Sequence, residues 1–274
     1  MHASALKYGK LFFDSYCLNL TDIIVVDIGA QNVNGSLRDV CPSSFKYVGV
    51  DFVGGNGVDV VLDDPYKLPF ENDSLDVVVC SSVFEHSDFF WVLFLEIIRS
   101  LKPDGLFYLN VPSNGSFHQY PVDCWRFYPD SGHALVAWGK REGYPLTLLE
   151  SFIGEQSEGQ IECNEAWYDF VAVFVKNSMV NQEEICKNRI VDTGNYHTNG
   201  YSVHADAILN KSSMSPDHLT IIHQNQMIFE RDVQIAKQVA QIAEQGAQIA
   251  DLFNSLSWRL TAPLRSAYSY FQKN

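Results

Sequence analysis

The sequence predicts an α/β fold with a seven-stranded, mostly parallel sheet, helices on both of its faces, and a separate C-terminal heptad helix. Apolar runs of strand length alternate with helix-like stretches between residues 23 and 176, which is typical of parallel sheets covered on both faces. A seven-residue repeat near the C-terminus predicts the separate helix. With 274 residues, 46% of them hydrophobic, the chain is long enough for one full α/β domain and an appendage.

Seven apolar runs are expected to form strands because each is short and is bounded by turn residues. In chain order they are 23–28, 46–52, 58–62, 75–81, 106–111, 146–153 and 167–175. The clearest helix is 89–101, with Ser87 or Asp88 as its N-cap and the turn residues 102–105 as its stop. A second helix is expected between Pro129 and Gly143.

The composition changes after residue 176, where the first predicted domain, 1–176, ends. Residues 177–223 are rich in Asn, Ser, His and Asp, which predicts a polar linker or an irregular extension. Residues 224–274 are expected to form an amphipathic or coiled-coil helix and a tail, with apolar residues at every d position of the heptads and mixed residues at a. The d positions are Ile228, Ile235, Ile242, Ile249 and Leu256, and the a positions are Asp232, Val239, Gly246 and Phe253. This apolar stripe of a and d positions favours self-association. The alternative is a single helix packed on its own domain.

Charge and cysteine content argue against several classes of function. A formal net charge of -14 disfavours nucleic-acid binding, because phosphate contacts require clustered Lys and Arg. The six cysteines are scattered, and neither a C-x-x-C pair nor a His cluster indicates a metal site or a disulfide framework. The chain does not open with a signal-peptide pattern, and no segment has the ~18 consecutive apolar residues that span a bilayer. We therefore expect a soluble, cytoplasmic protein without a metal ion.

Two carboxylates stand at the ends of the first two predicted strands. Asp27 precedes Gly29, and Asp51 closes the second apolar run. Such residues meet at the carboxyl edge of a parallel sheet, where open α/β folds bind ligands. The turn 29–35 lacks the G-x-G-x-x-G spacing that a pyrophosphate requires, and Asp27 would repel phosphates but attract an ammonium group. The predicted ligand is a nucleoside with a cationic tail; the alternative is that both acids only cap turns.

The next two turns extend this pattern. The third predicted strand leads into Asp63 and Asp64, where an acid can accept a hydrogen bond from an exocyclic amine, and the fourth strand ends at Ser81. Four motifs in this order over residues 23–111 resemble the class I S-adenosylmethionine-dependent methyltransferases, in the branch related to the type 11 methyltransferase domain. The resemblance implies a Rossmann-like fold and S-adenosyl-L-methionine as the cofactor.

The resemblance also implies roles for individual residues. Asp27 and Gly29 would hold the methionine part, Asp51 would bind the ribose, and Asp63 would face the adenine. The implied cofactor-binding set is Asp27, Gly29, Ala30, Gln31, Gly35, Asp51, Phe52, Asp63, Asp64 and Ser81. The turn departs from the usual D-x-G-x-G-x-G of the family by Gln31 and a late Gly35, so a side-chain contact from Gln31 would replace a backbone one.

A loop rich in polar and aromatic residues follows the fifth predicted strand. Residues 118–129 resemble a pattern, H-x-x-P-x-D-x-W-R-F-x-P, seen in methyltransferases associated with surface-polysaccharide synthesis. This implies O-methylation of a sugar hydroxyl on a glycan or nucleotide-sugar acceptor. His118 is the candidate base because its ordinary pKa lies near neutrality, with Asp123 to orient it or substitute for it and His86 in reserve. The alternative for His118 is a loop histidine bonded to a backbone carbonyl.

The C-terminal tail also favours a function in glycan synthesis. Residues 257–265 resemble a segment found at the ends of heptad regions in polysaccharide-assembly enzymes. The tail 254–274 carries Arg259, Arg265 and Lys273 and no acid, which suits a peripheral contact at the inner membrane face or with a glycosyltransferase. A second hypothesis is therefore a catalytically weak or inactive module that recruits glycan-assembly enzymes through its C-terminal helix. A nicotinamide-dependent sugar-nucleotide enzyme is disfavoured by the glycine spacing.

Overall fold

The computed structural model describes residues 3–155, 167–177, 189–203, 207–209 and 215–272. The chain divides into two units, Met1–Pro216 and Asp217–Asn274. The described cysteines, Cys17, Cys41, Cys80 and Cys124, form no disulfide, and the remaining two lie outside the described residues. Parts of the predicted linker 177–223 and the basic Lys273 also lie outside them.

The first unit contains one sheet with the strand order β3-β2-β1-β4-β5-β7-β6-β8-β9. Among the described residues the pairs that join β1 to β5 are parallel and the pairs beyond β5 are antiparallel. The strands are β1 (Ile24–Ile28), β2 (Lys46–Asp51), β3 (Val60–Val61), β4 (Leu75–Ser81), β5 (Leu101–Pro112), β6 (Thr147–Gly154), β7 (Asp169–Val175), β8 (Tyr196–Ser202) and β9 (Ala207–Leu209). The predicted α/β class is confirmed, but the predicted count of seven strands is wrong. Strands β8 and β9 come from the region expected to be a linker.

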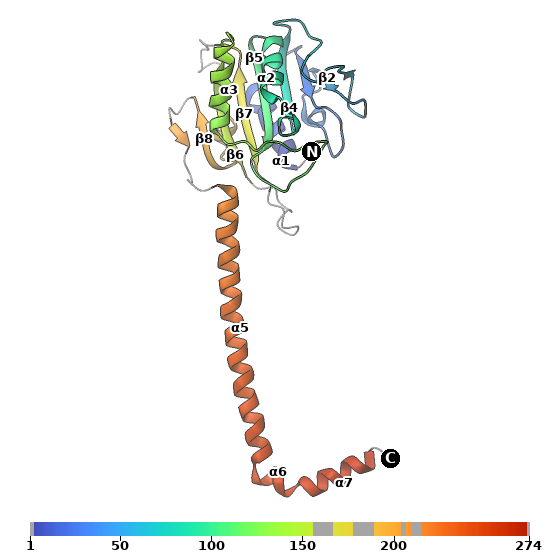
Figure 1. Cartoon of the computed structure of the whole chain (residues 1–274), viewed down its shortest axis with the longest axis vertical. Coiled ribbons are helices and arrows are strands. Elements are labelled where there is room, and N and C mark those ends of the chain that lie inside the picture. Colours follow the sequence, from blue (N-terminus) through green and yellow to red (C-terminus); the bar gives the residue numbers. More distant parts are fainter. Residues whose placement is uncertain (1–2, 156–166, 178–188, 204–206, 210–214, 273–274) are drawn as a thin grey trace. The chain divides into compact units, whose positions relative to one another are not determined.

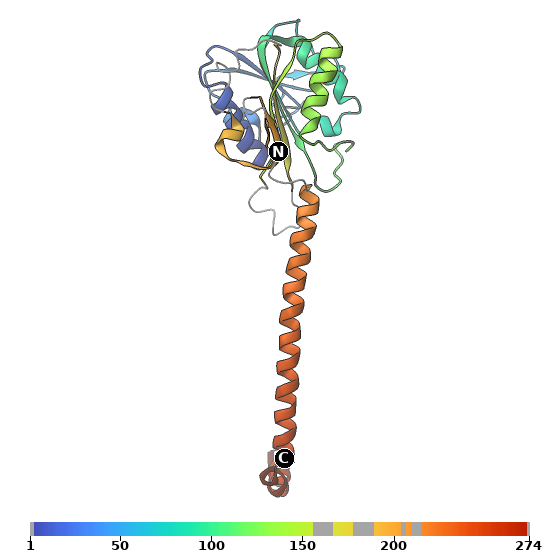
Figure 2. The same cartoon turned by 90° about the vertical axis from the view of Figure 1, so that its left-hand side faces the viewer.

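Helices cover both faces of this sheet (Figures 1 and 2). One face packs on α2 (Phe90–Ser100) and α3 (Asp130–Arg141). The other packs on α1 (Ala3–Tyr16) and two short 3-10 turns, η1 (Leu37–Val40) and η4 (Ile190–Thr193). The strands supply both cores because successive side chains point to opposite faces.

Two local predictions around α2 differ from the structure. The residue before the helix is Phe89, which makes no side-chain cap, so neither Ser87 nor Asp88 is the N-cap. The turn residues 102–105 do not lie outside the strand but belong to β5, which starts at Leu101 with a register shift against β4. Asp104 allows this because it adopts a positive φ of 65° and its N–H donates to the Lys176 carbonyl. Pairing with the neighbouring segments therefore outweighs the local turn preference.

The topology places a ligand-binding edge beside β1. Strand β1 lies between β2 and β4. The chain adds β2 and β3 on one side of β1 and then crosses over to add β4 and β5 on the other side. The carboxyl ends of strands at such a switch point form a crevice in open α/β sheets. Asp27, Asp51 and Ser81 stand at the ends of β1, β2 and β4. The fold thus brings three of the predicted cofactor-binding residues to one edge.

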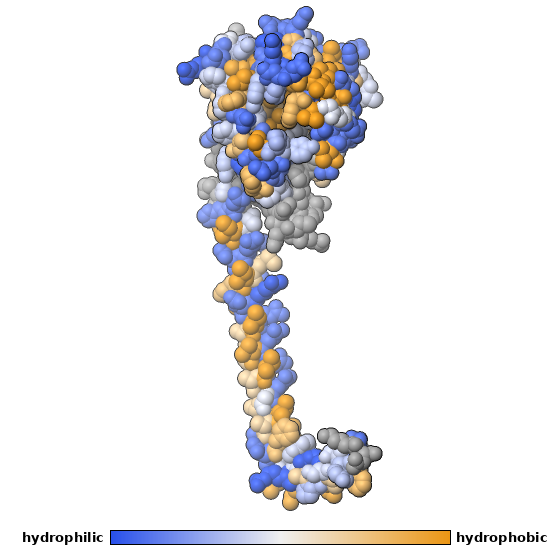
Figure 3. Space-filling view, turned by 45° about the vertical axis from the view of Figure 1, so that its right-hand side comes forward, coloured by the Kyte–Doolittle hydropathy of each residue, from blue (hydrophilic) through white to orange (hydrophobic). Residues whose placement is uncertain are grey.

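The second unit consists of α5 (Pro216–Asn254), α6 (Leu256–Leu260) and α7 (Ala262–Gln272). The long helix begins before the predicted residue 224, with proline at its first position, where a missing N–H costs nothing. Ser255 separates it from α6, and its Oγ accepts from the Trp258 N–H. Apolar residues recur along α5 (Figure 3) and are exposed, including Val239 at 60% and Ile242 at 67%. Among the described helices, none has the length and apolarity to cross a membrane.

Candidate functional site

Asp27 is a buried carboxylate at the end of β1. Only 3% of it is exposed, and the Tyr47 hydroxyl donates to its Oδ2 at 2.6 Å. Burial raises the pKa of Asp27 to about 7, against the opposing effects of the Tyr47 hydrogen bond and the nearby Arg38 guanidinium. Sequence reasoning missed Tyr47, although a tyrosine within an otherwise apolar strand signals a hydrogen bond. Asp27 is therefore a group whose charge changes near neutral pH.

The glycine turn after β1 is held against β2. The N–H groups of Gly29 and Ala30 both donate to the Val50 carbonyl, at 2.8 and 3.1 Å. Gly29 has a φ of 80°, and a Cβ added there would overlap the Val83 side chain. Gly35, at the far end of the turn, lies instead beside Leu6 of α1. The structure therefore brings Gly29 and Ala30 to the edge beside Asp27 but places Gly35 against a helix.

Asp51 connects this turn to the end of β2. Its Oδ2 accepts from the Gln31 N–H at 3.2 Å and its Oδ1 from the Val53 N–H at 3.1 Å. Phe52, next in the chain, is half exposed at 52%. Gln31 also reaches the loop between β5 and α3, residues 113–129, here called the acceptor loop. Its Oε1 accepts from the Tyr120 hydroxyl at 3.1 Å. Sequence reasoning did not single out Tyr120, which joins the two predicted halves of the site.

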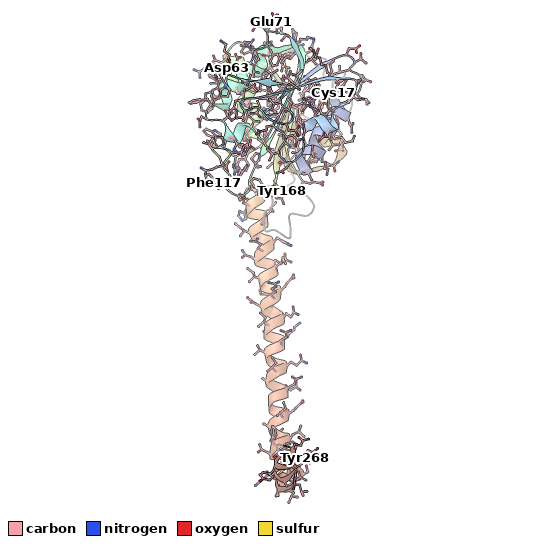
Figure 4. The ribbon with its side chains drawn as sticks, turned by 90° about the vertical axis from the view of Figure 1, so that its right-hand side faces the viewer. Cys17, Asp63, Glu71, Phe117, Tyr168 and Tyr268 are labelled. Carbon is pink, nitrogen blue, oxygen red and sulfur yellow. The ribbon has the colours of Figure 1, made fainter. Side chains whose placement is uncertain are left out.

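The predicted cofactor-binding residues after β3 are exposed, whereas the one at the end of β4 is buried. The Leu62 N–H donates to the Asp51 carbonyl at 2.8 Å, which ties the third turn to β2. Asp63 and Asp64 are exposed, and Asp64 accepts from the Tyr66 N–H as a turn cap. Figure 4 shows Asp63 well apart from Phe117 of the acceptor loop. Ser81 is 5% exposed, and its Oγ has no hydrogen-bond partner in the described part of the chain.

The acceptor loop packs against the short 3-10 turn η2 (Phe84–His86). The N–H groups of Cys124 and Trp125 both donate to the Glu85 carbonyl, at 2.7 and 3.3 Å. This contact brings His118 to His86, with ring centroids 4.9 Å apart. The Glu85 Oε1 lies 3.7 Å from the His86 Nε2. Two of the predicted catalytic residues therefore meet a carboxylate that the predicted catalytic set lacked.

Asp123 accepts hydrogen bonds from two other residues of the acceptor loop. Its two oxygens accept from the Arg126 guanidinium at 2.5 and 2.8 Å, and Oδ2 also accepts from the His118 N–H at 2.8 Å. The Arg126 hydrogen bonds lower the pKa of Asp123 to about 2. Asp123 thus stays ionised at neutral pH, and its Oδ2 lies 3.3 Å from the His118 Nδ1. This arrangement suits orientation of His118 better than proton uptake by Asp123.

Glu85 and His86 are the more enclosed members of the cluster. Glu85 is 1% exposed, and burial raises the pKa of its carboxyl to about 8. The His86 Nδ1 lies 2.5 Å from the Val122 carbonyl oxygen, and burial lowers the pKa of His86. Because Nδ1 is engaged, the Nε2 of His86 faces Glu85 as the available nitrogen. Adjacent acidic and imidazole residues were the sequence signal for Glu85, but its position within 4.8 Å of His118 depends on the loop.

Comparison with known proteins identifies the type of domain. Residues 12–109 match the family model described as a methyltransferase domain, type 11. This segment contains β1 to β4 and the carboxylates at their ends. No curated protein matches the chain.

Several solved structures are similar to about two thirds of the chain. The YcgJ protein from Bacillus subtilis is 14% identical, with a TM-score of 0.45, over 64% of this chain and 99% of that one. The 1,6-didemethyltoxoflavin-N1-methyltransferase from Burkholderia thailandensis is 16% identical, with a TM-score of 0.48, over 64% of this chain and 79% of that one. A SAM-dependent methyltransferase from Archaeoglobus fulgidus is 16% identical, with a TM-score of 0.45, over 62% and 94%.

At such identities and scores, the substrate of a neighbour says nothing about the substrate of this chain. The predicted link to polysaccharide synthesis therefore stays a prediction. The prediction of a methyltransferase domain is confirmed over residues 12–109, which match the methyltransferase-domain model.

Proposed function

We propose that the protein is an S-adenosylmethionine-dependent O-methyltransferase that acts on a sugar hydroxyl of a surface polysaccharide or its precursor. One observation carries the cofactor half of this proposal. Asp51 accepts from the backbone of the turn that holds Gly29, next to the buried Asp27, at the switch point of the sheet. All of these residues lie in the segment that matches a methyltransferase domain.

The residues at this edge fit the proposed cofactor. Each Asp51 oxygen accepts one backbone N–H, and each has a further lone pair for a ribose hydroxyl. Gly29 lets the turn pack close to Val83, where a Cβ would overlap that side chain. The buried Ser81 Oγ supports the fit because a ligand group would satisfy it. Asp27 supplies negative charge for the ammonium of the methionine part, directly or through water. When bound, the cofactor supplies a methyl group on a sulfonium, so the protein has to align the acceptor, exclude water and remove a proton.

The acceptor loop supports a sugar as the substrate. Phe117 and Tyr120 are exposed at 72% and 59% on this loop, and flat aromatic faces pack well on the apolar faces of sugar rings. A sugar hydroxyl has to lose its proton when the methyl group arrives, so a nearby acceptor for that proton helps. His118 stands beside Glu85 and His86 and is oriented by Asp123. We assign the removal of the proton to this cluster.

Cofactor affinity is expected to rise about tenfold between pH 6 and pH 7.5. The pKa of Asp27 is raised to about 7 in the free protein, so Asp27 is mostly neutral at pH 6 and gains its charge, and its attraction for the ammonium, above pH 7. Titration calorimetry with S-adenosylmethionine at several pH values in this range measures the effect. Asp27→Asn should bind weakly and without this pH dependence; an unchanged slope in that variant would show that Asp27 is not the group responsible.

The reaction itself is tested with the purified chain and with cells. S-adenosylmethionine should raise the melting temperature and NAD should not, because only a ligand of the folded state stabilises it. Mass spectrometry of surface glycan should show a methyl group that cells without the protein lack. His118→Ala should restore little of this methylation, with kcat lowered about 10²–10⁴-fold and cofactor affinity unchanged. Full methylation by His118→Ala would remove this residue from the mechanism.

One observation on the second unit, Asp217–Asn274, favours an alternative function. The a and d positions of α5 are exposed, as expected for a helix that associates with a second copy or with a glycosyltransferase. In this alternative the protein recruits glycan-assembly enzymes and has lost turnover. Impaired glycan assembly in cells without the protein, with no missing methyl mass, would favour it.

A further inference from the structure

We propose that Glu85, His86 and His118 form a binding site for one divalent transition-metal ion such as Zn²⁺. One carboxylate oxygen and one nitrogen from each ring all lie within 4.8 Å of one another. Glu85 and His86 come from η2, whereas His118 comes from the acceptor loop. The Cys124 N–H binds the Glu85 carbonyl and so fixes the loop beside η2. Two imidazoles and a carboxylate are a ligand set that zinc enzymes use, with further positions left for water or substrate.

The distances require only a small adjustment. Zinc bonds to nitrogen and oxygen of about 2.0–2.2 Å place ligand atoms roughly 3.3 Å apart in a tetrahedron. The Glu85 Oε1 and the His86 Nε2 are already 3.7 Å apart. His118 has the most exposed side chain of the three, at 37%. An inward movement of its ring by up to about 1.5 Å would therefore complete the set.

The Nδ1 of each histidine ring lies beside an oxygen atom, as is typical of metal-binding histidines. The His86 Nδ1 faces the Val122 carbonyl, and the His118 Nδ1 faces the Asp123 carboxylate and the Ser116 carbonyl. Metal-binding histidines characteristically donate one ring N–H to a carbonyl or carboxylate, which leaves the other nitrogen unprotonated for the ion. Both rings share this arrangement although they come from different segments.

A buried oxygen without a partner points to the same ligand. The Glu85 Oε2 is enclosed and has no hydrogen-bond partner among the residues that the structure describes. Asp123 and Asp169 add negative charge near Glu85, and Arg126 adds one positive charge that is paired with Asp123. The two neighbouring carboxylates outweigh the single guanidinium, so the surroundings of Glu85 carry net negative charge that favours a cation there. The two imidazoles favour Zn²⁺ over Mg²⁺, which prefers oxygen ligands and water.

The consequence for catalysis rests on the proposed function. A hydroxyl bound to such an ion loses its proton more readily than a free one. The acceptor O–H bond would break with release of the proton to water, and the oxygen would use that electron pair to form the bond to the methyl group. The bond between the methyl carbon and the sulfonium sulfur would break at the same time, with its electron pair going to the sulfur, which leaves as the neutral thioether S-adenosylhomocysteine. His118 would then act as a ligand of the ion and not as the base.

The test uses the untagged, full-length chain, which is stripped of metal with a chelator, incubated with Zn²⁺ and then dialysed. We expect elemental analysis to find one Zn²⁺ per chain, and calorimetry to show binding of Zn²⁺ but not of Mg²⁺. Glu85→Gln and His118→Ala should each weaken Zn²⁺ binding at least 100-fold, and Asp123→Asn should weaken it about 10–100-fold. The matched control is His133→Ala, which removes an exposed histidine of α3 and should bind like the unmodified chain.

Two results would overturn the metal site: no stoichiometric Zn²⁺ in the unmodified chain, or unchanged affinity in His118→Ala. His118→Ala decides the question if Glu85→Gln does not fold, because the His118 side chain is partly exposed. Cofactor binding is measured separately on the metal-free chain. A chain that binds S-adenosylmethionine but no Zn²⁺ refutes the metal site alone, whereas a chain that binds Zn²⁺ but no S-adenosylmethionine refutes the proposed function.

Discussion

Replacing Asp51 by alanine is expected to lower the affinity for S-adenosylmethionine at least 100-fold. In the proposed binding mode, Asp51 accepts from both ribose hydroxyls, and hydrogen bonds to a charged group contribute about 1.5–3 kcal/mol each. The carboxylate also accepts from the Gln31 and Val53 N–H groups, so its loss would loosen the turn that approaches the cofactor. Both effects act on the same ligand, and titration calorimetry measures their sum.

The matched control for this experiment is Asp39→Ala. Asp39 is an exposed acid on η1, so the variant loses the same charge without losing a ribose contact and should bind normally. Melting curves without ligand separate the two effects at Asp51, because loosening of the turn lowers the melting temperature of the free protein. If Asp51→Ala folds and binds S-adenosylmethionine as the unmodified chain does, the cofactor assignment is wrong.

Replacing Gly29 by alanine is expected to lower the free energy of unfolding by about 3 kcal/mol. A side chain at the observed φ of 80° costs about 1–2 kcal/mol, and overlap of the new Cβ with the Val83 side chain adds the typical 1–3 kcal/mol of overpacking. The variant should also lose cofactor affinity, because Gly29 and Ala30 would be displaced from the edge. Denaturant unfolding measures the first effect and calorimetry the second.

Gly143 provides a control that separates strain from overlap. It has a similar φ of 91°, but an added Cβ would meet nothing within 4 Å. Gly143→Ala should therefore cost only about 1–2 kcal/mol and leave cofactor binding intact. The double variant Gly29→Ala/Val83→Ala should recover part of the loss. Equal destabilisation by the two single glycine variants would contradict a role for the contact with Val83.

The strands and the first two carboxylates could be predicted because their signals are local. A buried strand in a parallel sheet is a short apolar run, and the predicted runs contain all of β1 to β4 but only half of β5. Asp27 and Asp51 follow such runs directly, so the sheet itself carries them to the same edge. Helix α1 was not predicted, although its buried residues Ala5, Tyr8, Phe12 and Tyr16 recur at helical spacing. Strands β8 and β9 were missed because they lie in a stretch rich in polar residues, without an apolar run.

The chemistry of the site depends more on tertiary contacts. His118 and Asp123 were predicted from a loop motif, but their approach to Glu85 and His86 is made by backbone hydrogen bonds between the loop and η2. The pKa of Asp27, raised to about 7, results from burial under elements that are distant in the sequence. Neither a hydrogen bond across a gap of more than 30 residues nor the degree of burial is encoded in residue spacing.

The sequence by itself determined the α/β class and the order of the carboxylates along the chain, because apolar periodicity and turn residues act over a few neighbouring positions. Its resemblance to methyltransferases indicated the type of domain that residues 12–109 match. Only the tertiary structure decided that the sheet extends to nine strands in its described part, that Gln31 bonds Tyr120, and that Glu85, His86 and His118 converge. The physical reason is that pairing, burial and convergence depend on how separate segments pack. That packing lowers the free energy of the whole chain, and no single segment carries it.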